Sequence, residues 1–186
     1  MENLSFIPFP FIRTQRLLLR QIKHSDLNDI FFLRSDERVM KYLDRPRDKS
    51  TSDTYEFIQK IIDAEKNNEG ITWAITLKNK IKLIGTIGFW RIQKEHYRAE
   101  IGYTLHPDFW GKGIMREALS EVVNYGFNVM KLHSIEANVN PDNTSSIKLL
   151  ERNGFWREAY YKENYFFNGK FIDTVIYSLL IDKNKK

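Results

Sequence analysis

The segment of residues 106–118, HPDFWGKGIMREA, has the residue types and spacing best suited to chemistry. A strand pattern ends at Leu105, and Gly111-Lys112-Gly113 stands where a helical pattern begins. The first N–H groups of a helix have no partner within it and carry the positive end of its dipole. Glycines let this backbone approach an oxyanion, and Lys112 and Arg116 add positive charge, so the segment could hold a pyrophosphate. A Gly-x-Gly before a helix is also a common tight turn, and the P-loop ending and the third glycine of the dinucleotide fingerprint are both absent.

The elements that must position this segment follow from hydrophobic periodicity. Runs of β-branched and aromatic residues predict strands at 16–22, 72–77, 82–91, 98–105, 134–140, 155–166 and 171–181, the last two joined by an Asn168-Gly169 turn. Helical spacing predicts helices from the Ser25-Asp26 cap to about residue 34, from about Ser52 or Asp53 onward, and at 113–130 and 143–152. This order predicts an α/β (α+β) domain around a mixed sheet of about seven strands with flanking helices.

The chain contains no internal repeat or low-complexity linker. We therefore expect one domain over residues 1–186, with residues 1–13 as an N-terminal extension and 183–186 as a basic tail. Residues 1–11 are apolar but interrupted by Glu2, Pro8 and Pro10, unlike a signal peptide. No run approaches the roughly 18 apolar residues that span a bilayer. A cytoplasmic protein without a membrane partner is the simplest expectation.

Composition restricts the chemistry further. The excess of 29 Lys and Arg over 24 Asp and Glu, a net charge of +5, favours anionic partners without choosing among nucleotides, nucleic acid and acidic membranes. The absence of cysteine excludes disulfides, thiolate nucleophiles and thiolate metal sites. Acyl transfer must then go directly to the acceptor, or through a hydroxyl, Lys, His or carboxylate nucleophile. The four histidines are far apart, so we expect no metal site.

Two longer segments carry a family resemblance. The run AEIGYTLHPDFWGKGIMREAL (99–119), followed by VNPDNTSSIKLLERNGF (139–155), resembles the GNAT superfamily of acetyltransferases, and within it the Rim-type ribosomal-protein-alanine N-acetyltransferases. TQRLLLRQI (14–22) and LIGTIGF (83–89) add support, so the resemblance covers nearly the whole chain in the expected order. It implies an acetyl-CoA-dependent N-acetyltransferase that moves an acetyl group directly to a primary amine in a ternary complex.

The resemblance also assigns the acetyl-CoA contacts. The family's phosphate-loop pattern, Gln/Arg-x-x-Gly-x-Gly/Ala, falls on Trp110, Gly113 and Met115, and the first and last of these depart from it in a way common in the Rim-type branch. The pantetheine arm should lie between two splayed parallel strands, 98–105 and 134–140. The cofactor-binding residues implied are Tyr103, Thr104, Leu105, Trp110, Gly111, Lys112, Gly113, Ile114, Met115, Arg116 and Asn143.

Amine acetylation needs a base for the ammonium, a donor for the tetrahedral oxyanion and stabilisation of the departing thiolate. Glu100, on the strand before the loop, is the candidate base, although a strand glutamate could equally serve in a salt bridge. Weaker alternatives are Glu95, His96 and Glu163. A backbone N–H near Tyr103 is the expected oxyanion donor.

Asn143-x-x-Ser146 is the second family motif. The resemblance implies that Asn143 hydrogen-bonds the pantetheine and that Ser146 approaches the thiol, and Asn143 is also a good helix N-cap. Many superfamily members place a general-acid tyrosine four residues after this serine, where this chain has Leu150. A serine hydroxyl is a poor acid and a thiol of pKa about 8.5 can leave as thiolate, so we expect Ser146 to hydrogen-bond the sulfur.

Other readings remain open at this stage. A non-catalytic CoA-binding or sensing domain of the same fold is opposed by Glu100, Asn143 and Ser146 but kept open by Leu150. A nucleic-acid-binding domain is opposed by the scattered basic residues and the absence of a binding motif. Nothing selects among protein N-termini, polyamines, amino acids and amino sugars as acceptor. Tyr42, Arg45 and Arg47 are candidates for shaping the acceptor site. Aromatic residues such as Trp90 are expected in the core or in a pocket wall. The family resemblance also favours a homodimer.

Overall fold

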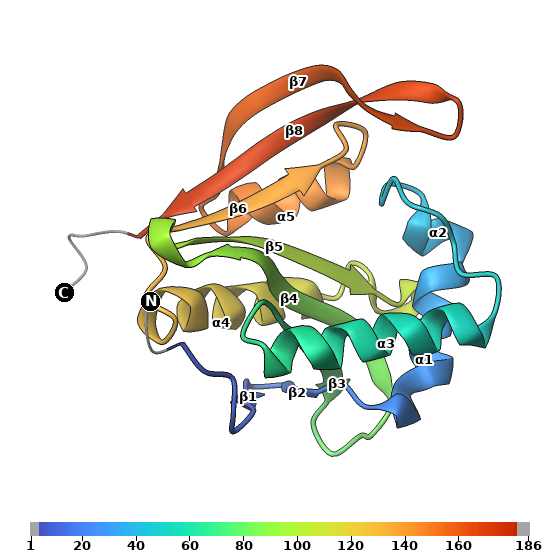
Figure 1. Cartoon of the computed structure of the whole chain (residues 1–186), viewed down its shortest axis with the longest axis vertical. Coiled ribbons are helices and arrows are strands. Elements are labelled where there is room, and N and C mark those ends of the chain that lie inside the picture. The colour runs from blue at the N-terminus through green and yellow to red at the C-terminus, as the bar shows by residue number, and fades with distance from the viewer. Residues whose placement is uncertain (1–3, 182–186) are drawn as a thin grey trace.

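The computed structural model describes residues 4–181, and its strands form one sheet in the order β1-β2-β3-β4-β5-β6-β8-β7 (Figure 1). The elements in chain order are β1 (Ile12–Arg13), β2 (Leu17–Gln21), α1 (Leu27–Ser35), α2 (Glu37–Met40), α3 (Thr51–Lys66), β3 (Ile71–Leu77), β4 (Leu83–Gln93), β5 (Arg98–Leu105), α4 (Ile114–Asn128), β6 (Ser134–Val139), α5 (Thr144–Arg152), β7 (Trp156–Phe167) and β8 (Lys170–Leu180). Neighbouring strands are antiparallel except β5 and β6, which are parallel. The predicted mixed α/β sheet is therefore confirmed.

Two elements were not expected from the sequence, β1 and α2, and both are too short to show a period. β1 pairs with β2 through Ile12 opposite Leu19. It lies in the stretch that we expected to be an N-terminal extension, where Phe6 is also fully buried and the Pro10 carbonyl accepts a hydrogen bond from the Trp73 indole at 2.7 Å. Residues 4–13 thus pack on the domain, while the basic tail at 183–186 lies outside the described residues.

Local chemistry sets the ends of the elements. Ser50 and Asp53 form a capping box, so α3 begins slightly before the predicted Ser52 or Asp53. Gly154 takes a left-handed φ of 85° just after α5, which ends as the Asn-Gly pair predicts. Asn168 and Gly169, with φ of 50° and 79°, turn β7 into β8.

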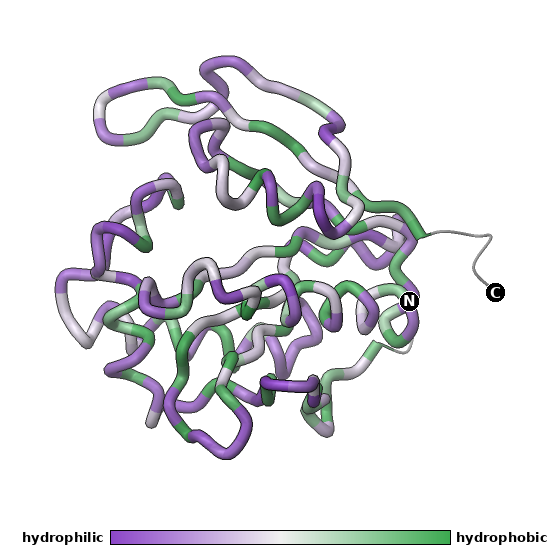
Figure 2. Tube along the Cα trace, turned by 180° about the vertical axis from the view of Figure 1, so that it is seen from behind, coloured by the Kyte–Doolittle hydropathy of each residue, from purple (hydrophilic) through white to green (hydrophobic). Residues whose placement is uncertain are grey.

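Two hydrophobic clusters cover opposite faces of the sheet. The larger one packs α4 and part of α5 against the strands, with Ala118, Leu119 and Leu150 fully buried. The smaller one packs α1 and α3, with Ile30 and Ile58 at its centre. Figure 2 shows that hydrophobic residues also occur on the protruding β7–β8 hairpin, where the exposed rings of Phe166 and Phe171 lie 5.0 Å apart.

The parallel pairing between β5 and β6 is short, so the two strands separate next to the candidate site. Arg98–Glu100 pair with residues 134–136, whereas beyond them β5 continues to Leu105 and β6 to Val139 without pairing to each other. Figure 1 shows the sheet opening there, with β4 and β5 on one side and β6, β8 and β7 on the other. At the open end, Asn140 Nδ2 donates to the Asp44 carboxylate oxygens at 3.1 and 3.2 Å, so the α2–α3 loop contacts the far side of the opening.

Candidate active site

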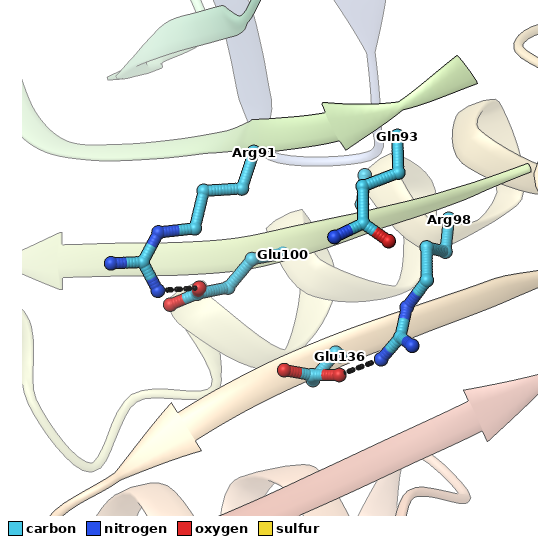
Figure 3. A pocket seen from close by; sticks show the side chains of 6 residues that line it. Arg91, Gln93, Arg98, Glu100 and Glu136 are labelled. Carbon is cyan, nitrogen blue, oxygen red and sulfur yellow. Dashed lines mark hydrogen bonds and ion pairs between the residues drawn. The ribbon is translucent and has the colours of Figure 1, made fainter. Parts of the chain in front are cut away.

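Two carboxylates lie where the parallel strands begin to separate. Glu100 on β5 and Glu136 on β6 are register partners, and they share a cavity of about 140 Å³ with Arg91, Arg98 and Gln93 (Figure 3). Each carboxylate has its own arginine: Arg91 Nη1 lies 2.9 Å from Glu100 Oε2, and Arg98 pairs with Glu136. Glu100 is only 8% exposed, so this is a largely buried carboxylate at the edge of a cavity.

Arg91 reaches Glu100 because β4 is irregular. The β4–β5 register shifts between Trp90 and Gln93, and Arg91 within this bulge has a left-handed φ of 48°. Such a backbone is unfavourable for a residue other than glycine, and β-bulges are over-represented next to active sites. No pattern in the sequence indicated a bulge, so Arg91 was missed. Within the described residues it contacts one oxygen of Glu100, and Oε1 has no hydrogen-bond partner.

Trp90 forms a wall beside this carboxylate. It is the antiparallel register partner of Glu100, so both side chains lie on the same face of the sheet. The indole crosses Gly102 so closely that a Cβ there would lie 1.8 Å from Trp90 Cη2. Trp90 remains 39% exposed, which places an aromatic face next to the carboxylate and makes a side chain at residue 102 impossible without moving the ring.

The opposite face of β5 carries a second polar contact. The Tyr103 hydroxyl lies 2.7 Å from Ser146 Oγ, which joins β5 to the first turn of α5. Asn143 caps this helix, its Oδ1 accepting a hydrogen bond from the Ser146 N–H at 3.1 Å. Burial raises the pKa of Tyr103 to about 12 against the smaller lowering effect of the Ser146 hydrogen bond, so its phenol is neutral at physiological pH. We had expected Tyr103 to act only through its backbone.

The glycine loop presents the unpartnered N–H groups of a helix start. Gly111 and Gly113 have left-handed φ values of 71° and 72°, and a Cβ on Gly111 would meet nothing within 4 Å. Gly113 is the N-cap of α4, and Glu117 N–H is the first to bond back, to the Gly113 carbonyl at 3.1 Å. The N–H groups of residues 114–116 are thus free to bind a ligand. The side chains of Ile114 and Met115 are buried in the core, which leaves only their backbone for this purpose.

Comparison with known proteins identifies this arrangement. A family model described as an acetyltransferase (GNAT) domain matches residues 16–156. The chain belongs to the GNAT acetyltransferase family.

Three relatives illustrate how far the GNAT likeness extends. The uncharacterized N-acetyltransferase YoaA of Bacillus subtilis is 37% identical over 172 residues, which cover 92% of this chain and 97% of YoaA. The ribosomal protein uS5 alanine N-acetyltransferase of Escherichia coli is 27% identical over 180 residues, covering 94% and 93%. The structure of Vibrio cholerae spermidine N-acetyltransferase in complex with CoA and spermine matches with a TM-score of 0.80 at 27% identity, over 90% of this chain and 96% of that one.

These GNAT relatives confirm the predicted enzyme class, an acetyl-CoA-dependent N-acetyltransferase, and the non-catalytic alternative is not favoured. Two structural findings accompany this conclusion. Between residues 4 and 181, no group of three or more His, Asp or Glu side chains is placed to hold a metal ion. In the same part of the chain, no helix has the length and apolar character needed to cross a membrane.

Three residues to which the family resemblance drew attention have contacts of their own in the structure. Trp110 Nε1 donates to the Leu105 carbonyl at 2.7 Å, so the indole ties the loop to the end of β5 while remaining exposed. The Thr104 side-chain hydroxyl forms a 2.8 Å hydrogen bond with the Thr86 hydroxyl on β4. Leu150, at the position of the usual tyrosine, is fully buried in the core and could not reach a ligand.

Arg16 is a residue beside the glycine loop that the sequence alone did not single out. Its Nε donates to Glu117 Oε2 at 2.6 Å and its Nη1 to the Lys112 carbonyl at 3.0 Å. Its Nη2 would lie 3.5 Å from a Cβ on Gly113, which puts its positive charge beside the glycine loop. The TQR tripeptide of the family resemblance pointed to this part of the chain. It did not reveal the contact, because Arg16 and Lys112 are 96 residues apart in the sequence.

The other predicted candidates lie elsewhere. Glu95 and His96 are exposed in the turn before β5, and Glu163 is exposed at an irregularity of β7, so among the four candidate bases Glu100 alone borders the cavity. Arg45 and Arg47 line a separate cavity of about 370 Å³ beside the Arg34–Asp48 ion pair. Burial and the neighbouring Arg34 lower the pKa of Arg45 to about 10.

Proposed function

We propose that this enzyme transfers the acetyl group of acetyl-CoA directly to a primary amine, with CoA entering the opening between β5 and β6. The observation that carries the proposal is the separation of these strands beyond Glu100, which leaves the backbone of residues 101–105 unpaired on that side. This unpaired edge of β5 runs from Glu100, where the two strands separate, to the glycine loop. It can therefore bind the amide-bearing arm of CoA while the loop binds the phosphates.

We assign the pyrophosphate to the N–H groups from Gly111 to Arg116, with the exposed Lys112 and Arg116 adding charge. The pantetheine arm runs along Tyr103, Thr104 and Leu105 toward Asn143, and Trp110 covers the start of the loop. The buried side chains of Ile114 and Met115 support the loop without contacting the ligand.

Glu100 is our proposed base. A lysine-like amine with a pKa of about 10 is almost entirely protonated at pH 7, so the proton must be removed before the nitrogen attacks. The free Oε1 can accept this proton directly or through a water, while Arg91 holds the other oxygen. A backbone N–H on the unpaired edge of β5 stabilises the oxyanion.

The acceptor enters from the face of the sheet that carries Glu100 and Trp90, through the cavity that Glu100 lines. Its polar lining carries two arginines and two glutamates in pairs, so the cavity has no excess negative charge to select a polycation. We therefore propose an amine of either kind that the relatives' names indicate, a small molecule or a protein N-terminus. A homodimer in the cytoplasm is the remaining expectation, and sedimentation measures the oligomeric state.

Calorimetry with acetyl-CoA, together with a free-thiol assay against a panel of amines, tests the function. Binding with amine-dependent thiol release supports both the cofactor and the reaction, and the rates rank the acceptors. Spermidine and an alanine-initiated peptide are the two informative members of the panel. An absence of acetyl-CoA binding would remove the assignment of the loop and the strand opening.

A further inference from the structure

The paired hydroxyls of Tyr103 and Ser146 suggest a role that the family motifs do not assign. We propose that Tyr103 is a positioning residue for Ser146, holding the serine hydroxyl so that its O–H points to the sulfur that leaves as CoA thiolate. This inference rests on the proposed function, since it concerns the same thioester.

The contact is held from both sides. Tyr103 comes from β5 and Ser146 from the first turn of α5, and their oxygens lie 2.7 Å apart across the strand opening. Asn143 Oδ1 fixes the Ser146 backbone at 3.1 Å. Within the described residues, neither hydroxyl has another hydrogen-bond partner, so Asn143 positions the Ser146 backbone and Tyr103 alone orients its hydroxyl by a hydrogen bond.

The number of hydroxyl protons decides which of Tyr103 and Ser146 donates the hydrogen bond between them. Serine has a single hydroxyl proton, and Ser146 can give it to sulfur only if it does not give it to Tyr103. A phenol is the more acidic of the two hydroxyls and therefore the better donor. With Tyr103 donating to Ser146 Oγ, the serine proton is free for the thiolate, and the charge that develops on sulfur strengthens both bonds.

Tyr103 keeps its own proton in this step. Burial raises its pKa to about 12, well above that of a thiol, about 8.5, so proton transfer from the phenol to the thiolate is unfavourable. When the tetrahedral intermediate collapses, the C–S bond breaks and its electron pair stays on sulfur. Glu100 passes the first ammonium proton to solvent before attack and, as a carboxylate again, takes the second proton from the nitrogen that has become cationic in the intermediate. The thiolate takes a proton from solvent after release.

Burial explains why the phenol comes from β5. The α5 position that carries a tyrosine in many relatives is Leu150 here, fully buried in the core. The strand residue Tyr103 brings a phenol instead to Ser146, in the first turn of α5, one turn before Leu150.

A double-mutant cycle in single-turnover acetylation tests the role. We expect Tyr103→Phe to slow acetyl transfer by about fivefold, as for loss of one modest hydrogen bond, with the Kd of CoA changed less than twofold. Ser146→Ala should slow it at least as much, and adding Tyr103→Phe to Ser146→Ala should change nothing further. Tyr125→Phe is the matched control, since Tyr125 is also a partly buried tyrosine, packed on Trp73, and should leave the rate unchanged.

Each other outcome overturns the inference. Equal slowing by Tyr103→Phe with and without Ser146 would mean that it does not act through the serine. An unchanged rate in Tyr103→Phe, or a loss of CoA affinity matching the loss of rate, would leave it a structural contact. Activity of the wild-type enzyme that falls through an alkaline pKa absent from Tyr103→Phe would make it a true acid. Failure of the wild type with every amine is a separate result, because it removes the proposed function itself.

Discussion

The indole of Trp90 on β4 occupies the space that a side chain at Gly102 on β5 would need. A Cβ there would lie 1.8 Å from Cη2 and 2.6 Å from Cζ3 of the ring. Because Trp90 is also the register partner of Glu100, the missing side chain at residue 102 lets the aromatic ring cross β5 beside the proposed base.

Gly102→Ala should therefore displace the ring. We expect the free energy of unfolding to fall by about 1–3 kcal/mol, as for other overpacked sites, and the KM for the amine to rise while the Kd of CoA is kept. Chemical denaturation and steady-state kinetics measure the two effects. Adding Trp90→Ala removes the clash, so the double variant should lose less stability than the sum of the single ones; strict additivity would contradict the contact.

Gly113→Asp should abolish CoA binding. Two like charges about 4 Å apart repel by about 4 kcal/mol near a protein surface, which predicts at least a hundredfold loss of affinity by calorimetry. Gly113→Asn has the same shape and backbone strain without the charge, and should retain much more binding. Gly169→Asp is a second control, because Gly169 has a similar φ of 79° in open space at the hairpin turn. Equal losses in the Asp and Asn variants would show that the charge at this position does not matter.

Glu100→Gln should lower turnover by about a hundredfold or more while leaving CoA affinity nearly intact. The deficit should be largest near neutral pH and shrink as pH approaches the amine pKa of about 10, since the free amine then needs no base. Glu136→Gln removes the same charge from the neighbouring strand and should cost less than about tenfold. A Glu100→Gln enzyme with the wild-type rate would show that another group takes the proton.

Ionisation of Glu117 should make the free energy of unfolding depend on pH in the acid range. Burial alone would favour its neutral form, but hydrogen bonds from Thr14 and Arg16 and the arginine charge prevail and lower its pKa below the usual 4.5. A lowered pKa contributes stability above the unfolded value that is lost as pH falls through the folded one. Glu117→Gln should thus have a lower melting temperature than wild type at pH 7, and the gap should begin to narrow below about pH 4.5 and close as pH falls through the lowered folded pKa. A gap that does not narrow at all as the pH is lowered from 7 into the acid range would exclude ionisation as its source.

Much of the site could be predicted from single elements. Glu100, the Gly111-Lys112-Gly113 turn and the Asn143 cap each depend on one strand, one turn or one helix end, and hydrophobic periodicity and glycine conformation are local properties. The sheet of β5 and β6 followed from the same patterns, as did the Asn168-Gly169 hairpin.

Tertiary structure decided the contacts between elements. The Arg91–Glu100 pair needs a bulge that no period reveals, Arg16 reaches the glycine loop across the fold, and Tyr103 meets Ser146 only because β5 and α5 face each other over the opening. The sequence alone determined which backbone groups can bind an anion and which strand carries the carboxylate. Which side chains complete the site depended on how the strands separate, because hydrogen bonds between distant residues form only where packing brings them within about 3 Å.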